Sequence, residues 1–169
     1  MPAAPDFAYS YLPTPIGLLE LKGSDAGLAA VTFLDDSALP ETPQDAVALC
    51  LREAHQQLRA YFGRELRDFS LVYDQPSGTE FQQRVWQVLQ GIRYGRTASY
   101  LDLARQLGNA GAVRAVGAAN GQNPLAIVWP CHRIIGASGQ LTGYAGGLPR
   151  KKWLLAHEQP AAQTTLFGF

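Results

Sequence analysis

The stretch Ile127-Val128-Trp129-Pro130-Cys131-His132-Arg133-Ile134-Ile135 sets a cysteine between two apolar segments. An apolar run of this length is typical of a buried strand. Pro130 has no amide hydrogen for a sheet ladder, so the chain is expected to leave regular strand pairing there. Cys131 would then stand on a packed scaffold at the edge of a pocket. His132 and Arg133 can lower the pKa of a thiol, and the thiolate is the nucleophilic form.

The residues around this stretch resemble the O6-alkylguanine-DNA alkyltransferases, whose acceptor motif is similar to Pro130-Cys131-His132-Arg133. The resemblance runs in order and without an obvious gap from about Thr79 to Glu158, whereas the residues before it are similar to the family only loosely. The other matching segments are Arg114-Ala115-Val116-Gly117, Asn123-Pro124, Gly143-Tyr144-Ala145-Gly146-Gly147 and Lys152-Trp153-Leu154-Leu155-Ala156-His157-Glu158.

The resemblance implies DNA repair by direct reversal. The alkyl group of O6-alkylguanine, and also of O4-alkylthymine, would pass irreversibly to Cys131, without a cofactor. In the family a histidine, here His132, takes the thiol proton through a water, and Glu158 holds that histidine. Tyr100 matches the family's phenol, which donates to guanine N3 as the base departs. No residue regenerates the thiol, and a thioether is inert to water, so each molecule is expected to act once.

The residues themselves support parts of this arrangement. Neighbours in an extended chain point to opposite sides, so a direct bond between Cys131 and His132 is not expected. Glu158 lies near the end of a helix that Pro149 is expected to begin. A carboxylate there opposes the helix macrodipole, and a cationic or donor partner would offset the cost. A frayed, solvated glutamate is the alternative for Glu158, and a packing residue is the alternative for Tyr100.

The resemblance places four more residues at the pocket or its hinge. Asn123 would tie a helix-turn-helix to the active-site turn, Tyr144 lies in the glycine loop, and Lys151 matches a basic residue near the pocket. The family commonly has serine where this chain has Ala145, so a hydroxyl is lost while the backbone N–H remains a donor for guanine O6. Trp129 also departs from the family, which usually has a smaller aliphatic residue before the Pro-Cys pair. Its indole must find space and a partner.

The net charge of zero hides an asymmetry between the two halves of the chain. Residues 1–78 carry five Lys/Arg and eleven Asp/Glu, a balance of −6, and residues 79–169 carry nine Lys/Arg and three Asp/Glu, a balance of +6. We therefore expect only the C-terminal half to meet a polyanion. Chance solvation of two surfaces is the alternative.

Two short helices joined by a glycine-containing turn, at about residues 99–120, resemble a helix-turn-helix. The second helix carries Arg114, Gly117 and Ala118 on a face with few long polar side chains, which suits close approach to a minor groove better than base reading in a major groove. The family resemblance implies that Arg114 fills the gap left by a flipped alkylguanine in double-stranded DNA. A small-residue helix packed against another helix is the alternative.

The periodicity predicts a mixed α/β (α+β) chain of two domains. Residues 1–75 would form a small antiparallel sheet with a helix, and residues 76–169 a mainly helical domain. We expect strands at Phe7–Leu12, Leu18–Lys22 and Leu28–Leu34, a helix opened by Thr42-Pro43 and ended by Gly63, and a further strand within Leu66–Tyr73. Cys50 would lie on the apolar face of that helix and His55 on its surface.

Composition excludes several classes of protein. No apolar stretch is long enough to span a membrane, and the N-terminus has no signal-peptide pattern. Cys50 and Cys131 make neither a disulfide framework nor a zinc-ligand set, so we expect free thiols in a reducing cytoplasm and no bound metal. We also expect a monomer. Three alternatives stay open: a buried structural cysteine at Cys131, a non-catalytic module that recognises alkylated DNA, and a cysteine hydrolase using Cys131, His132 and Glu158. The papain-type and caspase-type signatures are absent.

Overall fold

The computed structural model describes residues 6–35 and 41–160. Strands β1 (Ala8–Thr14), β2 (Gly17–Ser24) and β3 (Gly27–Leu34) are followed by a 3-10 turn (Gln44–Ala46) and helices α1 (Leu49–Phe62) and α2 (Glu80–Leu89). Then come β4 (Ala98–Ser99), α3 (Tyr100–Gln106), a 3-10 turn (Ala110–Ala112), α4 (Val113–Gly121), a 3-10 turn (Cys131–Arg133), β5 (Ile134–Ile135) and α5 (Leu148–Glu158). The predicted α+β class is confirmed.

The elements belong to two compact units. One is drawn from Met1–Thr79 and Asn123–Trp129, and the other from Glu80–Gln122 and Pro130–Phe169. We refer to them as the sheet unit and the helical unit. The chain leaves the helical unit after α4, contributes seven residues to the sheet unit, and re-enters the helical unit immediately before Cys131.

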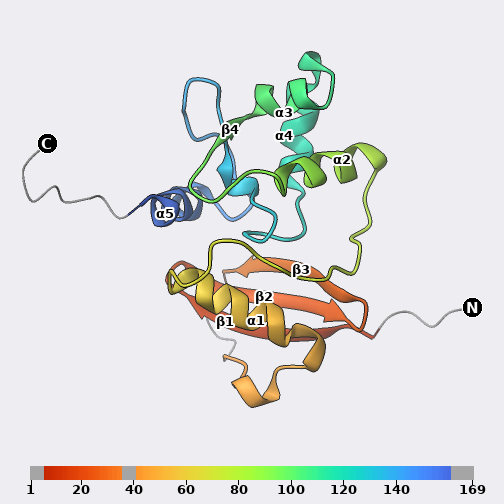
Figure 1. Cartoon of the computed structure of the whole chain (residues 1–169), viewed down its shortest axis with the longest axis vertical. Coiled ribbons are helices and arrows are strands. Elements are labelled where there is room, and N and C mark those ends of the chain that lie inside the picture. Colours follow the sequence, from red (N-terminus) through yellow and green to blue (C-terminus); the bar gives the residue numbers. More distant parts are fainter. Residues whose placement is uncertain (1–5, 36–40, 161–169) are drawn as a thin grey trace, which may run out of the picture. The chain divides into compact units, whose positions relative to one another are not determined.

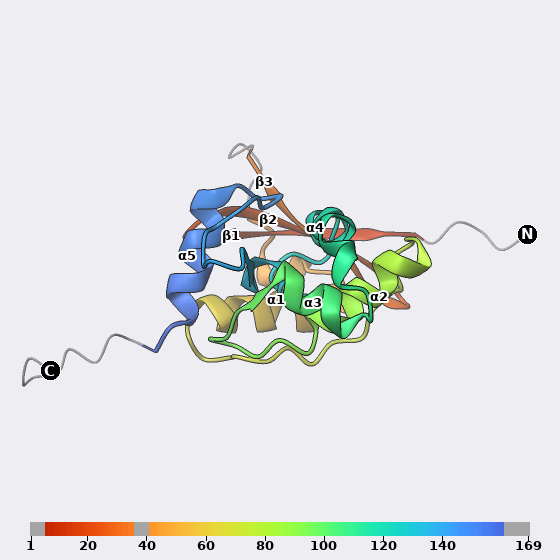
Figure 2. The same cartoon turned by 90° about the horizontal axis from the view of Figure 1, so that it is seen from above.

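The sheet unit is an antiparallel meander in the order β1-β2-β3, with α1 along one face (Figure 1, Figure 2). The three strands lie where the sequence predicted them. Leu19 and Leu21 of β2 and Leu51 and Leu58 of α1 are fully buried, so sheet and helix share one apolar core. At Gly27 a Cβ would lie 2.4 Å from the Val72 carbonyl oxygen, and φ is +134°, so only glycine fits this turn.

The segment before Pro130 is buried, but it is not a strand. Leu125 forms a single parallel bridge with Val31 of β3, and residues 126–128 then form a turn in which Ile127 has a φ of +71°. The prediction of a buried strand here was wrong because apolar composition records burial and does not distinguish a strand from a buried turn. The Trp129 indole is accommodated edge-on against Tyr73, with ring centroids 5.3 Å apart.

The start of α1 also differs from the prediction. Thr42 does not cap a helix: its Oγ1 accepts the Tyr11 N–H at 2.8 Å, and its own N–H donates to the Tyr11 carbonyl. Pro43 therefore precedes a single 3-10 turn, and α1 begins only at Leu49. A threonine followed by proline is typical of a helix start. Here the threonine instead forms two hydrogen bonds with the Tyr11 backbone at the edge of β1.

Two side chains on α1 exchange their predicted environments. His55, expected at the surface, is 1% exposed, and Cys50, expected in the core, is partly exposed. Nδ1 of His55 lies 3.3 Å from Oγ of Ser10, and its Nε2 lies 3.4 Å from the Arg59 guanidinium. Residues 66–73 form no strand of their own and contribute only a bridge from Tyr73 to Leu28.

In the helical unit, α2, α3 and α4 pack together, and α5 lies apart from this group (Figure 2). The Trp86 indole N–H on α2 donates to the Ala119 carbonyl on α4 at 2.9 Å, which fixes the two helices. Ser99 caps α3 through a full capping box with Asp102. Within residues 6–35 and 41–160, no helix has the length and apolarity needed to cross a membrane.

Candidate active site

A two-stranded parallel pairing brings the predicted site residues of the helical unit together. Ala98 pairs with Ile134 and Ser99 pairs with Ile135. Tyr100 directly follows β4, and Cys131 begins the 3-10 turn that directly precedes β5. The Asn120 side chain on α4 donates to the Cys131 carbonyl at 3.3 Å, and Cys131 is 5% exposed. The cysteine is therefore held by its backbone from two directions.

His132, Arg133 and Glu158 form a buried ionic network behind this turn. Nε2 of His132 lies 2.7 Å from Oε1 of Glu158. The Arg133 guanidinium binds both carboxylate oxygens, with its Nε 2.8 Å from Oε2 and a terminal nitrogen 2.9 Å from Oε1. The other terminal nitrogen donates to the Ile92 carbonyl at 2.6 Å. Glu158, at the end of α5, thus has the cationic and donor partners that its position against the macrodipole requires.

The network holds His132 neutral and Glu158 charged. Burial lowers the pKa of His132, and the nearby positive charges of Arg133 and Lys151 lower it further, while Glu158 offsets this only in part. Burial acts to raise the pKa of Glu158, but hydrogen bonds from His132 and Arg133, together with the positive charge of Arg133, outweigh it and hold that pKa well below its usual range.

The neutral histidine has its tautomer set by the glutamate. A charged carboxylate accepts a proton but has none to give, so Nε2 of His132 carries the ring hydrogen and donates to Glu158. Nδ1 is then the basic nitrogen. It is buried and has no hydrogen-bond partner among the described residues. His132 can therefore take up a proton at Nδ1.

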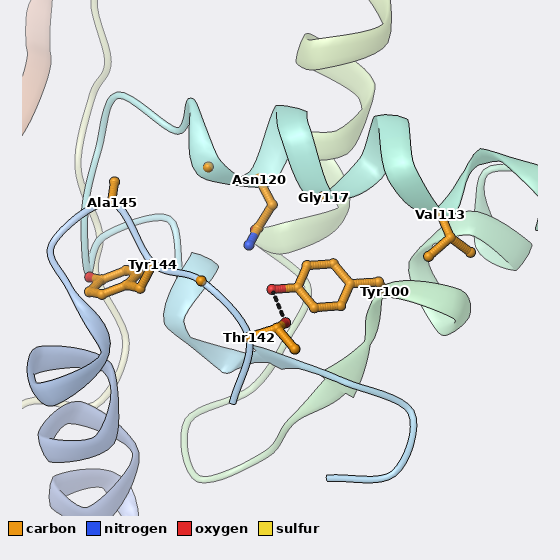
Figure 3. A pocket seen from close by; sticks show the side chains of 9 residues that line it. Tyr100, Val113, Gly117, Asn120, Thr142, Tyr144 and Ala145 are labelled. Atoms are coloured by element: carbon orange, nitrogen blue, oxygen red, sulfur yellow. Dashed lines mark hydrogen bonds between the residues drawn. The ribbon is translucent and has the colours of Figure 1, made fainter. Parts of the chain in front are cut away.

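A cavity of about 480 Å³ lies in the same unit (Figure 3), and its wall includes Asn120, whose side chain binds the Cys131 carbonyl. The residues that line it come from α3, α4 and the loop before α5: Tyr100, Val113, Gly117, Asn120, Gly121, Thr142, Gly143, Tyr144 and Ala145. Its lining is more apolar than polar. Such a hollow suits a flat, mostly apolar group with a few polar atoms.

Two of the predicted pocket residues, Tyr144 and Ala145, line this cavity, and a third, Lys151, binds the lining residue Gly143. The Tyr144 hydroxyl is buried and has no hydrogen-bond partner among the described residues. Burial raises the pKa of Tyr144 well above its ordinary value, and negative charge on Cys131 adds to this effect. Tyr144 therefore keeps its proton. Lys151 on α5 is fully buried, and its ammonium donates to the Gly143 carbonyl at 3.2 Å. Ala145 lines the cavity beside them.

The remaining predicted residues are Asn123 in the sheet unit and Arg114, Gly117 and Ala118 on α4. The Asn123 side chain holds a turn of the sheet unit, accepting from the Leu125 N–H and donating to the Trp129 carbonyl at 2.7 Å. Arg114 and Ala118 are exposed on α4. Gly117 lines the cavity, and a Cβ at this position would make an ordinary contact of 3.8 Å with the Tyr100 ring.

Three residues of the site were not singled out by sequence reasoning. Arg133 was considered only for its effect on the thiol, and its bidentate hold on Glu158 was missed. Asn120 and Thr142 were not identified at all, although both line the cavity. An arginine next to a histidine, with a glutamate at the end of a later helix, could have suggested the first. The sequence offers no comparable signal for Asn120 or Thr142.

Comparisons with known proteins agree with this arrangement. Residues 7–75 match the ribonuclease-like domain of 6-O-methylguanine DNA methyltransferase, and residues 80–160 match its DNA binding domain. The chain is 50% identical over 162 residues to a methylated-DNA–protein-cysteine methyltransferase of Mycolicibacterium paratuberculosis, covering 94% of this chain and 98% of that protein. It is 47% identical over 152 residues to the protein of that name from Methanosarcina acetivorans, covering 89% and 97% of the two.

Solved structures are similar as well. The crystal structure of the Mycobacterium tuberculosis O6-methylguanine methyltransferase is 45% identical, covers 96% of this chain and 99% of that one, and gives a TM-score of 0.79. A structure of the Mycobacterium tuberculosis protein in complex with DNA is 46% identical, covers 90% and 95% of the two chains, and also gives 0.79. The resemblance first seen between Thr79 and Glu158 is confirmed and extends over almost the whole chain. The chain belongs to the O6-methylguanine-DNA methyltransferase family.

Proposed function

We propose that this chain repairs DNA by direct reversal, moving an alkyl group from O6 of guanine to the Sγ atom of Cys131. The single observation that carries the proposal is a buried cysteine whose neighbour His132 is held neutral by the charged Glu158 and whose carbonyl is bound by Asn120, a wall residue of the cavity of about 480 Å³. A soft thiolate nucleophile suits attack on an alkyl carbon.

The reaction proceeds in one displacement. The thiol proton of Cys131 passes through a water molecule to Nδ1 of His132, and the glutamate stabilises the imidazolium that forms. The thiolate attacks the alkyl carbon, a C–S bond forms, and the C–O6 bond breaks with its electrons left on the guanine. Tyr100 donates a hydrogen bond to guanine N3, where the departing base becomes more basic, and the backbone N–H of Ala145 serves O6.

Specific roles follow for the pocket residues. Tyr144 forms a wall of the cavity and keeps its phenol proton next to the forming thiolate. Lys151 supports the loop that carries Tyr144. Asn123 braces the turn that leads from the helix-turn-helix of α3 and α4 toward Cys131. The product is a thioether that water cannot reverse, so each chain acts once.

The DNA face is proposed to be α4, docked in a minor groove as a monomer. Arg114 and Ala118 are exposed there, and residues 79–169 carry a charge of +6, which attracts the phosphate backbone without reading sequence. The alkylated base leaves the stack to reach the cavity, and Arg114 takes its place in the duplex. Protein of this kind works where thiols stay reduced, which favours the cytoplasm.

A burst titration tests this function. Excess duplex DNA carrying O6-methylguanine is mixed with a known amount of protein, and repaired base is counted over time. We expect transfer to stop at one methyl group per chain, with Cys131→Ala inactive and the matched variant Cys50→Ala fully active. Sustained turnover would point to a hydrolase, and activity in Cys131→Ala would require another acceptor. A DNA-binding module without transfer would show no repaired base at all.

A further inference from the structure

The Thr142 hydroxyl donates a hydrogen bond to the phenol oxygen of Tyr100, with 3.1 Å between the two oxygens (Figure 3). Tyr100 begins α3, whereas Thr142 lies in the loop before α5, and both line the cavity. We propose that Thr142 is a positioning residue for alkyl transfer: it fixes the direction in which Tyr100 presents its proton. This inference rests on the proposed function, because it concerns the donor to the departing guanine.

The hydrogen-bonding capacity of a phenol limits how Tyr100 can be oriented. The Tyr100 hydroxyl has one hydrogen to donate and can also accept. Once its oxygen accepts from Thr142, its own hydrogen must point elsewhere, and the cavity is lined on that side by Asn120 and Gly117. A guanine entering the cavity then meets a donor that is already oriented. Without the threonine the hydroxyl rotates, and it must be ordered again when the base binds.

The same hydrogen bond strengthens the donor. A hydroxyl that accepts one hydrogen bond is polarised and donates a stronger one, since bonds in a chain reinforce each other. The Lys151 ammonium acts in the same direction, because it lies 5.8 Å from the centre of the Tyr100 ring. Negative charge that develops on the phenol oxygen during transfer is therefore met by a hydroxyl donor and by a nearby cation.

The position of Thr142 is itself fixed. The next residue, Gly143, has a φ of +43°, and its carbonyl accepts from the buried Lys151 ammonium at 3.2 Å. The loop is thus tied to α5 one residue after the threonine. A β-branched side chain also has few allowed rotamers, which limits the directions that its hydroxyl can take. Support of this kind from a second layer of residues is what holds a reacting group in its productive geometry.

A purely steric role for Thr142, as part of the cavity wall, makes a different prediction. Valine has nearly the shape of threonine but no hydroxyl, and serine keeps the hydroxyl but loses the methyl group. A wall residue would tolerate Thr142→Val better than Thr142→Ser, whereas a positioning residue would show the reverse order. Because Thr142 is exposed in the free protein, neither change threatens the fold.

The test measures single-turnover methyl transfer from duplex DNA at rising DNA concentration, which separates the maximal rate from half-saturation. We expect Thr142→Val to lower the maximal rate about 5- to 20-fold, the effect of one hydrogen bond, and to leave half-saturation unchanged. Thr142→Ser should restore the rate to within about threefold of the original protein. Thr32→Val, an exposed change on β3, is the matched control and should have no effect.

A double-mutant cycle decides whether Thr142 acts through Tyr100. In a Tyr100→Phe background the phenol oxygen is gone, so Thr142→Val should cause no further loss. A full additional loss there, or a Thr142→Val effect confined to half-saturation, would overturn the proposal. In every variant the amount of methyl per chain should still reach one on Cys131. If the original protein did not reach one methyl group per chain on Cys131, the proposed function itself would be overturned. The two failures are therefore distinguishable.

Discussion

Nε2 of His132 lies 2.7 Å from Oε1 of Glu158, and both side chains are buried. The bond joins the residue after the acceptor cysteine to the last residue of α5, 26 positions later. It turns the imidazole so that the nitrogen facing away from the carboxylate is the basic one. In the proposed mechanism, the chemistry at Cys131 therefore depends on where α5 ends.

Glu158→Gln tests this dependence. The amide keeps the size of the side chain but removes its charge, so the tautomer of His132 is no longer enforced, and Arg133 loses its counter-ion. We expect methyl transfer to slow about 10- to 100-fold, typical of losing a group that orients a reacting one. The protein should also lose about 3–5 kcal/mol of stability in urea unfolding, as for a broken buried ion pair. Glu80→Gln on the exposed start of α2 is the control and should change neither quantity.

Arg133→Lys tests the bidentate contact. Lysine keeps the positive charge but has one ammonium group, which cannot bind both Glu158 oxygens and the Ile92 carbonyl as the guanidinium does. We expect a loss of about 1.5–3 kcal/mol in the free energy of unfolding, measured by urea titration. The exposed Arg96→Lys is the matched substitution and should stay within about 0.5 kcal/mol of the original protein. Equal effects of the two changes would mean that the charge alone matters.

Arg114→Ala separates insertion into DNA from binding of phosphate. An inserted side chain matters only where a base must leave its stack, at a cost of a few kcal/mol. Transfer from duplex DNA at saturation should therefore slow strongly, transfer from a single-stranded target less, and reaction with free O6-alkylguanine hardly at all. Single-turnover rates on the three substrates measure this. The control is Arg105→Ala, which removes one positive charge from an exposed position on α3. It should weaken DNA binding without slowing transfer at saturating DNA. Equal slowing on all three substrates would assign Arg114 to the fold or the pocket.

His55→Gln addresses the pH dependence of stability. Burial and the nearby Arg59 guanidinium lower the pKa of His55 below its usual 6.5, while Glu41 opposes this. The unfolded chain therefore binds the proton more readily, so the stability from neutral His55 is complete above pH 6.5 and is lost as pH falls below it. The loss approaches about 1.4 kcal/mol per pH unit for one proton. Urea unfolding at pH 7, 6 and 5 should give a shallower dependence in His55→Gln, and parallel curves would contradict this reading of His55.

The sequence was most informative where one local pattern determined the structure. Apolar and aromatic runs separated by turn residues placed the three strands of the sheet unit. The motif around Cys131 identified the family because its residues are close together in the chain. These features depend on short-range spacing, which a single sequence displays directly.

The errors arose where distant residues compete for the same partner. Thr42 was expected to cap a helix, but its hydroxyl and its N–H group both bind the backbone of Tyr11 on β1. His55 was expected at the surface, but its two ring nitrogens are paired with Ser10 and Arg59 inside the sheet unit. The turn at Ile127 is buried like a strand and could not be told from one by composition. Thr142 meets Tyr100 only because β4 and β5 pair, a contact that no local spacing displays.

The central claim is that Cys131 receives the alkyl group, and locating that group tests it most directly. Protein is incubated with duplex DNA carrying isotopically labelled O6-methylguanine, digested, and its peptides are analysed by mass spectrometry. The account predicts that the peptide containing Cys131 gains one labelled methyl group in place of a hydrogen, and that the peptide containing Cys50 is unchanged. Label on Cys50, or label released to solution with Cys131 unmodified, would contradict it.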